Sequence, residues 1–412
     1  MTVQQQPDAY EKLAAQYGTP LYVYKTSVIR RQALRLKKAF PDFVLLYSMK
    51  CNPLPEICSL LAELGTGFDC CSGREVLAAS ETGLAYERIF YSAPGKTRQE
   101  IESSLGKSLV FADSWTELEL INSICRERGI VLEAGLRVSP AISLGQGTKP
   151  AILKAVPDKF GVPEEDLPAR AGWLASLKNI RITGLHVYMR SQVLDAETLS
   201  SVFSHTAAIA RLLHTNPGFQ LRYINFGGGF GIPYQAEEEL AIEDIGRACA
   251  TLAKDLLEIC PGVQLFLESG RYLVGQAGSF VSRILDVKEC RGTTFVIAEG
   301  LLNHFFRPAL ARLLGDLTES LPAGPKGPCE PLWGGPGILL PKVYGTPAPA
   351  RPVTLCGTLC TAQDCVARNV VLPDIVPGNL LVFPNAGAYG AVLSPHDFGF
   401  QKECRQVLIA DD

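Results

Sequence analysis

Between residues 40 and 270 the sequence alternates short apolar runs with longer amphipathic stretches, and this alternation limits the possible fold most. Segments such as 115–129 and 201–214 have the apolar spacing of helices. Eight strands separated by helices over about 230 residues predict a (β/α)8 barrel, although open α/β sheets can give a similar alternation. The expected strands are FVLLYS (43–48), GFDCC (67–71), RIFYS (88–92), SLVFA (108–112), VLEAGLRV (131–138), ITGLHVY (182–188), RYINF (222–226) and VQLFLE (263–268).

After Gln276 the pattern changes to strands without long helices between them. Stretches rich in proline and glycine separate these strands, which is typical of an antiparallel β domain. The early run LYVYK (21–25) precedes the barrel and is expected to join this second domain. A chain of 412 residues also exceeds what one core normally covers. We therefore predict a barrel over 26–276 and a β domain formed by 1–25 and 277–412.

Composition and charge exclude several classes of function. The formal net charge is −3, without acidic or basic blocks, which argues against nucleic acid or a membrane surface as the main partner. We find neither a signal-peptide pattern nor an apolar run long enough to span a membrane. The thirteen cysteines form no regular framework, as expected of reduced thiols in the cytoplasm. No histidine lies at zinc-finger spacing from them, so no metal site is expected.

In a barrel of this kind the chemistry lies at the carboxyl ends of the strands, and several polar residues are expected there. Lys50 follows the first strand, Tyr188 and Arg190 follow the sixth, GGGFG (227–231) follows the seventh, and Glu268 ends the eighth. A single lysine at a strand end can simply extend its amine into solvent. The joint placement of all these residues favours a functional site.

These residue types together suggest pyridoxal phosphate (PLP). The amine of Lys50 can form a Schiff base, and bare backbone N–H groups of the glycine run can bind a phosphate. The run lacks the spacing and downstream acid of a dinucleotide site, so a single phosphate is the better ligand. Glu268 can keep the pyridine nitrogen protonated. The alternatives are a flexible turn for the glycine run and an internal ion pair between Glu268 and Arg271.

At this point the sequence resembles a family, the fold-type III PLP-dependent decarboxylases that include the diaminopimelate and eukaryotic ornithine decarboxylases. The similar segments run from about residue 20 to 400 in the family's order. They are YSMKCNP (47–53), FDCCSGRE (68–75), HVYMRSQ (186–192), FGGGFG (226–231), ESGR (268–271), FFRPAL (305–310), CTAQD (360–364) and GAYG (387–390).

The resemblance implies a role for each matching residue. Lys50 would carry the cofactor, and Glu268 would face its ring nitrogen. Cys360 would be catalytic and would reach in from the second subunit of a homodimer. Either Cys360 or Lys50 would return a proton to Cα. The implied cofactor-binding residues are Lys50, Asp69, Tyr188, Ser191, Gly228, Gly229, Glu268, Arg271 and Tyr389, and the implied substrate-binding residues are Arg190, Arg307, Thr361 and Asp364.

Five departures from the family pattern bear on the substrate. Tyr188 stands where relatives place an imidazole over the cofactor ring, and Arg190 replaces a glycine. Ser269 replaces a proline, and Ala311 stands where diaminopimelate enzymes carry a tyrosine. Thr361 replaces the acid that pairs with a distal ammonium in relatives. Losing an anion and gaining a cation disfavours a distal ammonium and favours a neutral, acidic or conjugated far end.

The resemblance therefore implies a PLP-dependent decarboxylase that removes the α-carboxylate of an amino acid or amino-acid conjugate. The departures are similar to those of the secondary-metabolite branch, exemplified by the citryl-diaminopropionate decarboxylase of staphyloferrin-type siderophore synthesis. A decarboxylase of basic amino acids such as diaminopimelate or ornithine is one alternative. An amino-acid racemase on the same barrel is another, although Glu268 argues against it. A non-catalytic regulatory relative is the third.

Overall fold

The computed structural model describes residues 6–142, 159–234, 237–310, 342–344, 350–373 and 375–411. The chain divides into two compact units. The barrel unit comprises 30–232 and 238–270, and the β unit comprises 1–29, 233–237 and 271–412. The domain limits at 25/26 and 276/277 remain a prediction.

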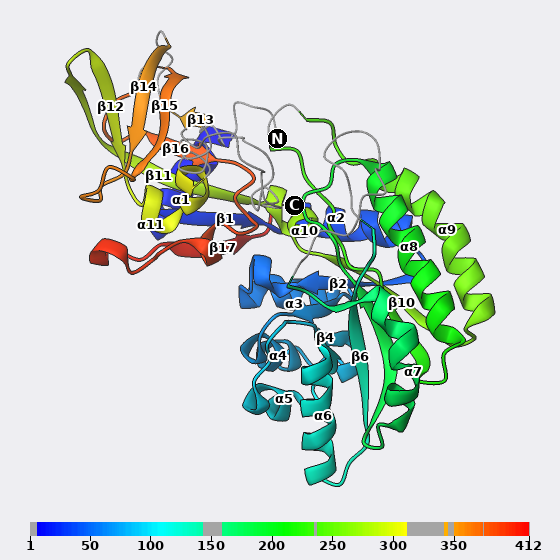
Figure 1. The fold of residues 1–412 in the computed structure, drawn as a ribbon. Coiled ribbons are helices and arrows are strands. Elements are labelled where there is room, and N and C mark those ends of the chain that lie inside the picture. Colours follow the sequence, from blue (N-terminus) through cyan, green and yellow to red (C-terminus); the bar gives the residue numbers. More distant parts are fainter. Residues whose placement is uncertain are drawn as a thin grey trace, which may run out of the picture. The chain divides into compact units, whose positions relative to one another are not determined.

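The barrel unit contains a closed parallel sheet surrounded by helices, which confirms the predicted fold class (Figure 1). The strand order is β5-β4-β3-β2-β10-β9-β8-β6, and pairing of β5 with β6 closes the barrel. All eight predicted runs contribute a strand. The strands are β2 (Phe43–Ser48), β3 (Gly67–Cys70), β4 (Ile89–Tyr91), β5 (Leu109–Ala112), β6 (Leu132–Ser139), β8 (Ile180–Val187), β9 (Phe219–Asn225) and β10 (Gln264–Ser269), with the short β7 (Val162–Pro163) paired to β6.

The helices between these strands begin at residues that satisfy exposed backbone donors. Ser72, Ser114 and Asp195 each accept a hydrogen bond from a backbone N–H of the first helical turn, as good N-cap residues do. The helices are α2 (Thr26–Ala39), α3 (Pro55–Glu63), α4 (Gly73–Ser80), α5 (Arg98–Ser104), α6 (Trp115–Glu127), α7 (Leu167–Ser176), α8 (Ala196–His214) and α9 (Ile242–Ile259), and the first residues of α2 belong to the β unit.

Aromatic side chains fill part of the barrel core. The rings of Phe90 and Phe266 lie 4.6 Å apart, and those of Phe90 and Phe111 lie 5.1 Å apart. Gly135 and Gly184, paired in register on β6 and β8, make room for the ring of Phe111. A Cβ at Gly184 would lie 2.8 Å from that ring, which is closer than packed atoms tolerate. These glycines therefore allow a phenylalanine to lie against the two strands.

The β unit is built on a sheet that is mostly antiparallel. The strand LYVYK is β1 (Leu21–Lys25), which pairs antiparallel with β11 and parallel with β17. A second parallel pairing joins β12 to β14, so the sheet is mixed rather than purely antiparallel. The other strands are β11 (Gly278–Cys290), β12 (Thr293–Ala298), β13 (Lys342–Tyr344), β14 (Arg351–Cys356), β15 (Cys365–Leu372), β16 (Leu380–Phe383) and β17 (Arg405–Ile409).

Short helices complete the β unit. Helix α1 (Gln6–Tyr17) packs Tyr10 and Ala14 onto the apolar face formed by β1, β11 and β16. Helices α10 (Arg271–Val274) and α11 (Leu301–His304) are one turn long and carry residues described below. In the part of the chain that the structure describes, we find no helix long and apolar enough to cross a membrane. Each described cysteine is a free thiol.

Candidate active site

Lys50 lies immediately beyond strand β2, in a single 3₁₀ turn (Met49–Cys51). Its Nζ donates a hydrogen bond to Oδ2 of Asp69 at 3.0 Å. This contact follows from sheet register, because Ser48 at the end of β2 lies opposite Asp69 on β3. The Lys50 side chain remains 39% exposed, whereas that of Asp69 is 1% exposed. The predicted lysine is thus an accessible amine held at the barrel end by a buried carboxylate.

The surroundings of Asp69 keep its carboxyl group ionised. Burial alone would raise the pKa of Asp69, but the positive charge of Lys50, the nearby His186 and hydrogen bonds from Ser92 and Lys50 outweigh it. The pKa therefore lies below its usual value. Ser92 Oγ donates to Oδ1 of Asp69 at 2.8 Å. Both carboxylate oxygens of Asp69 are engaged, which fixes the side chain beside the lysine amine.

Glu268 lies in β10 and is 3% exposed. Asn225 Nδ2 donates to its Oε1 at 2.8 Å, and His186 Nε2 lies 3.1 Å from the same oxygen. The three residues come from adjacent strands β10, β9 and β8, with His186 and Asn225 in register. The hydrogen bond from Asn225 offsets part of the cost of burying this carboxylate, and the His186 ring lies beside it. The structure thus provides His186 and Asn225 as neighbours for the predicted Glu268.

The glycine run after β9 packs too closely on its neighbours to carry side chains. A Cβ at Gly228 would collide with the carbonyl oxygen of Glu268, and one at Gly229 would collide with that of Arg190. Gly229 also has φ +106°, a conformation that glycine adopts readily. The run therefore lies against both Glu268 and the segment that carries Arg190 and the half-buried Ser191. Its bare backbone suits the binding of a phosphate group.

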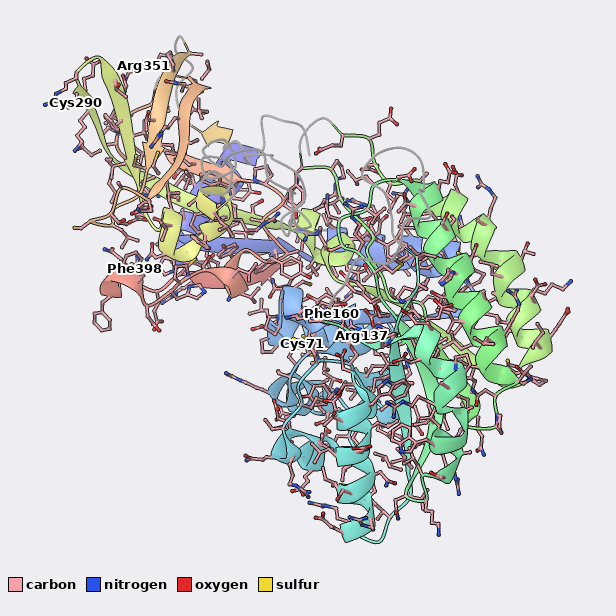
Figure 2. The ribbon with its side chains drawn as sticks, viewed as in Figure 1. Cys71, Arg137, Phe160, Cys290, Arg351 and Phe398 are labelled. Atoms are coloured by element: carbon pink, nitrogen blue, oxygen red, sulfur yellow. The ribbon has the colours of Figure 1, made fainter. Side chains whose placement is uncertain are left out.

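Aromatic and basic side chains lie near the lysine in the same unit. Lys50 Nζ is 5.9 Å from the ring centre of Tyr188, which is half-buried. Arg137 Cζ lies 5.8 Å from the Tyr188 ring centre and 4.3 Å from that of Phe160. Figure 2 labels Arg137 and Phe160 in the barrel unit. Arg137 is buried, and its Nη1 lies 3.4 Å from Asp113 Oδ1.

In the β unit, two arginines meet at one phenol. Nη1 of Arg271 donates to the Tyr234 hydroxyl oxygen at 2.7 Å, and Nη1 of Arg307 donates to the same oxygen at 2.8 Å. Arg307 also donates to the carbonyl oxygen of Ala388 at 3.3 Å. The ring centre of Tyr389 lies 4.9 Å from Arg271 Cζ. The structure thus brings together the predicted Arg271, Arg307 and Tyr389, with Tyr234 as the shared hydrogen-bond acceptor.

Cys360, Thr361 and Asp364 lie together on the loop between β14 and β15. Asp364 is buried, and its carboxylate accepts backbone N–H bonds from Leu302 (3.1 Å) and Leu359 (2.8 Å). Burial raises the pKa of Asp364, while its backbone donors oppose that rise. Cys360 is exposed. Asp364 therefore fixes the shape of the loop, and its role in substrate binding stays a prediction. Another position named in the sequence analysis, Ala311, lies outside the described residues.

Five residues of these clusters were missed by sequence reasoning. His186 is part of the motif HVYMRSQ but was not assigned a role there, although its place near the end of a predicted strand was a usable signal. Nothing in the sequence singled out the remaining four. The missed residues are Ser92, Arg137, His186, Asn225 and Tyr234.

Comparison with known proteins decides the family. Residues 26–275 match the pyridoxal binding domain of the pyridoxal-dependent decarboxylases. The chain belongs to this family. Its enzymatic activity is PLP-dependent amino-acid decarboxylation, and PLP is its cofactor.

Known relatives are similar over nearly the whole chain. Diaminopimelate decarboxylase of Aquifex aeolicus is 29% identical, covering 97% of this chain and 88% of that protein. The L-glutamyl-[BtrI acyl-carrier protein] decarboxylase of Niallia circulans is also 29% identical, covering 94% and 87%. The crystal structure of Helicobacter pylori diaminopimelate decarboxylase in complex with L-lysine is 27% identical, with a TM-score of 0.81 and coverage of 98% and 94%.

The residues of the barrel unit fit this cofactor. They include an accessible amine (Lys50), a glycine run without room for side chains, and a buried carboxylate (Glu268) with two polar neighbours. An amine, an anion-binding backbone and a carboxylate are the three groups that PLP requires for its aldehyde, phosphate and ring nitrogen. The decarboxylase family and its cofactor are thus consistent with the side chains present.

Proposed function

We propose that this decarboxylase acts on an α-amino acid whose far end carries a carboxylate or an amide-linked acidic group instead of a free ammonium. A citryl-diaminopropionate-type conjugate of siderophore or other secondary-metabolite synthesis belongs to this class. The observation that carries the proposal is Thr361, a neutral residue where the resembling enzymes carry an acid. Without that acid, a distal ammonium loses its counter-charge.

Two further features support an acidic far end. Arg307 places a buried guanidinium group beside Tyr234, and a buried cation favours an anionic ligand. Arg190 adds a cation where relatives have glycine. One relative is named for acting on a glutamyl group attached to a carrier protein, so conjugated substrates occur within the family.

We assign the barrel residues to the cofactor. Lys50 holds PLP through its amine, and Asp69 orients that amine through the 3.0 Å hydrogen bond. Glu268, supported by Asn225 and His186, keeps the pyridine nitrogen protonated. PLP, when bound, supplies an electron sink for the pair released when the bond to the α-carboxylate breaks.

The remaining cofactor assignments concern the ring face and the phosphate. Tyr188 stacks on the ring. Five residues bind the phosphate, some through their side chains and the glycines through backbone N–H groups. They are Ser191, Gly228, Gly229, Arg271 and Tyr389.

We assign the substrate and proton roles as follows. Arg190, Arg307 and Thr361 select the substrate's far end, and Asp364 acts on it through the shape of its loop. Cys360 or Lys50 returns a proton to Cα after decarboxylation. We further propose a cytoplasmic homodimer in which Cys360 serves the active site of the partner subunit, in keeping with the exposure of its thiol.

The most direct test compares 2-aminopimelate with 2,6-diaminopimelate, which differ only in the distal amino group. Each enantiomer of 2-aminopimelate and each isomer of 2,6-diaminopimelate would be incubated with the PLP-loaded enzyme, together with L-ornithine and a citryl-diaminopropionate conjugate. CO2 release and product mass would be measured. We expect higher kcat/KM for compounds without the distal ammonium, since no acid pairs with it.

A matched variant sharpens this test. Thr361→Glu restores the acid and should raise kcat/KM for diaminopimelate relative to 2-aminopimelate. The competing assignment is a basic amino-acid decarboxylase, which the similarity to diaminopimelate decarboxylases favours. If the unaltered enzyme prefers diaminopimelate or ornithine over every compound lacking the distal ammonium, our substrate proposal is wrong and that alternative holds.

A further inference from the structure

Two histidine rings of the β unit face each other through the same nitrogen atom. His304 ends helix α11, and His396 follows the 3₁₀ turn Ala391–Leu393. Their Nδ1 atoms are 3.1 Å apart, which is within the range of a hydrogen bond. Nε2 of His304 lies 2.8 Å from the carbonyl oxygen of Lys402, and Nε2 of His396 lies 2.7 Å from that of Ala391. Each ring is thus held at both of its nitrogen atoms.

This arrangement needs one hydrogen more than two neutral rings carry. A carbonyl oxygen can only accept, so each Nε2 must carry the hydrogen that it donates. A neutral imidazole has one N–H, and its other nitrogen then presents a lone pair. Two lone pairs would therefore face each other across the 3.1 Å contact between His304 and His396. A third hydrogen, on one of the two Nδ1 atoms, replaces this repulsion by a charge-assisted hydrogen bond and gives the pair one positive charge.

The neighbouring charged groups do not take the place of this hydrogen. The amine of Lys402 donates to a backbone carbonyl oxygen. Within the segments that the structure describes, no carboxylate is hydrogen-bonded to a ring nitrogen of the pair. The charged and titratable groups around the pair are Glu299 and Lys402, which line the same cavity as His304, Tyr22, whose hydroxyl donates to the carbonyl oxygen of His304, Cys404, which lies near Tyr22, and Asp397, which follows His396.

The pair joins the segment that carries Arg307 to a second segment, 388–396. His304 lies three positions before Arg307, and His396 is the last residue of the second segment. Two more contacts join the same segments. The backbone N–H of Phe306 donates to a serine hydroxyl of the second segment at 3.1 Å, and Arg307 donates to one of its carbonyl oxygens at 3.3 Å. Of these three contacts, the one between the histidines gains or loses a proton near neutral pH.

We propose that His304 and His396 share one proton between their Nδ1 atoms and that this contact positions Arg307 for substrate binding. The positioning role rests on the proposed function, which assigns the substrate's far end to Arg307. Without the proton, either two lone pairs face each other or one ring must release its carbonyl oxygen, so one hydrogen bond is lost in both cases. The two histidines are thus positioning residues, which act through the segment of Arg307.

The surroundings of the pair set the pH range. His304 is buried, whereas His396 is exposed. Burial lowers the pKa of His304, the bond to the Lys402 carbonyl oxygen opposes this, and the nearby His396 lowers the pKa further, so it lies below the usual histidine value. The contact therefore exists at acidic pH and is lost as pH rises, by about pH 6.5, the ordinary histidine pKa. We expect the KM of the substrate to rise across this range.

The first test follows the rings by NMR in PLP-loaded protein with isotope-labelled histidine. The chain has five histidines, and His304→Asn and His396→Asn assign the two signals by their disappearance. Between about pH 5 and pH 8, both rings should keep Nε2–H, and their signals should change together as the pair loses one proton. In His396→Asn the carboxamide can donate to Nδ1 of His304 without a titrating proton, so the His304 signal should hardly change. His214→Asn, at an exposed position of α8, is the control and should leave both curves as they are.

The second test is kinetic and uses the preferred substrate of the PLP-loaded enzyme. Over the same pH range, the KM of the unaltered enzyme should rise about fivefold relative to that of His396→Asn, the scale of one net hydrogen bond. The ratio of the two kcat values should change less than the ratio of the KM values. Equal KM profiles in the two proteins would contradict the positioning role.

Three NMR results would overturn the shared proton. The two rings could titrate independently, or either ring could carry its hydrogen on Nδ1 with Nε2 deprotonated. Signals that shift when EDTA is added would show that a metal ion lies between the rings instead. If the asparagine variants do not fold, the titration of the unaltered protein still decides. Because the NMR titration does not depend on turnover, failure of the proposed substrate class would be recognised separately.

Discussion

The clusters in the two units are opposite in charge. At the end of the barrel, two buried carboxylates, Asp69 and Glu268, accompany the partly exposed amine of Lys50 and a buried imidazole. In the β unit, two buried guanidinium groups, those of Arg271 and Arg307, share one phenol. Each cluster buries charge beside polar partners: Asp69 pairs with the charged amine of Lys50, whereas the two arginines share a phenol.

The two clusters therefore favour different kinds of ligand. The carboxylates of the barrel unit favour positively charged nitrogen atoms, such as a protonated ring or amine. The arginines of the β unit favour oxyanions. Under the proposed assignments, substitutions of Lys50 and Glu268 in the barrel unit should mainly change the rate of the chemical step, and substitution of Arg307 in the β unit should mainly change substrate affinity.

The largest effect is expected at Lys50. Lys50→Arg keeps the positive charge next to Asp69 but cannot form the covalent link to the aldehyde, and Lys50→Ala removes both. Both variants should lose turnover by about 10³-fold or more, as expected when a covalent catalyst is removed. Single-turnover measurements of CO2 release would check this. If the arginine variant turned over near the unaltered rate, charge alone would be sufficient at this position, and the covalent role of Lys50 would be contradicted.

Glu268→Gln should have the next largest effect. The substitution keeps the size of the side chain and a carbonyl oxygen for Asn225, but it removes the negative charge. We expect kcat to fall about 10²-fold, with KM changed little, because the charge acts on the electron sink. Steady-state kinetics would separate the two parameters. Asn225→Ala is the matched control and should reduce kcat less; a larger loss from the control would assign the main role to the amide.

In the β unit, Arg307→Lys should act on affinity. Lysine keeps the charge but loses the planar guanidinium that contacts both Tyr234 and Ala388. We expect KM to rise about tenfold for a substrate with a remote carboxylate, while kcat changes less than KM. The same variant should leave the KM of a substrate lacking that carboxylate nearly unchanged. A fall confined to kcat would contradict the assignment of this cluster to binding.

The smallest effect concerns stability and pH. The pKa of Asp69 lies below its usual value in the folded chain, against the raising effect of burial, because Lys50, His186 and hydrogen bonds favour the charged form. Its contribution to stability is therefore present above the ordinary carboxyl pKa of about 3.9 and is lost as pH falls through the lower folded pKa. Asp69→Asn should reduce the acid-side fall of Tm measured between about pH 5 and pH 2. An unchanged fall would remove Asp69 from this role.

Much of the barrel could be predicted from the sequence, because strand and helix periodicity is a local property. The run FVLLYS is β2 without a change of boundary, and VQLFLE differs from β10 by one residue at each end. Rim residues such as Lys50 followed from the rule that links strand ends to function. The parallel pairings in the β unit could not be predicted, since β1 and β17 are separated by most of the chain.

The partners within each cluster were harder to predict for the same reason. Tyr234 and Arg307 are 73 positions apart, and no local pattern indicates that a phenol meets two arginines. Asn225 lies in the predicted strand RYINF (222–226), but strand alternation does not tell which neighbouring side chain it contacts. His186 was easier to find because it lies within a motif, although only the structure shows that it is in register with Asn225. Motifs therefore identified most candidate residues, and only the fold supplied their contacts.

The central claim is that the amine of Lys50 forms a covalent bond to PLP, and borohydride reduction tests it most directly. Protein supplied with PLP would be reduced, digested and examined by mass spectrometry, with Lys50→Arg treated in parallel. We predict that the peptide containing YSMKCNP (47–53) gains the mass of the reduced cofactor in the unaltered protein alone. An unmodified peptide, or the same modification at another lysine in both proteins, would contradict the account.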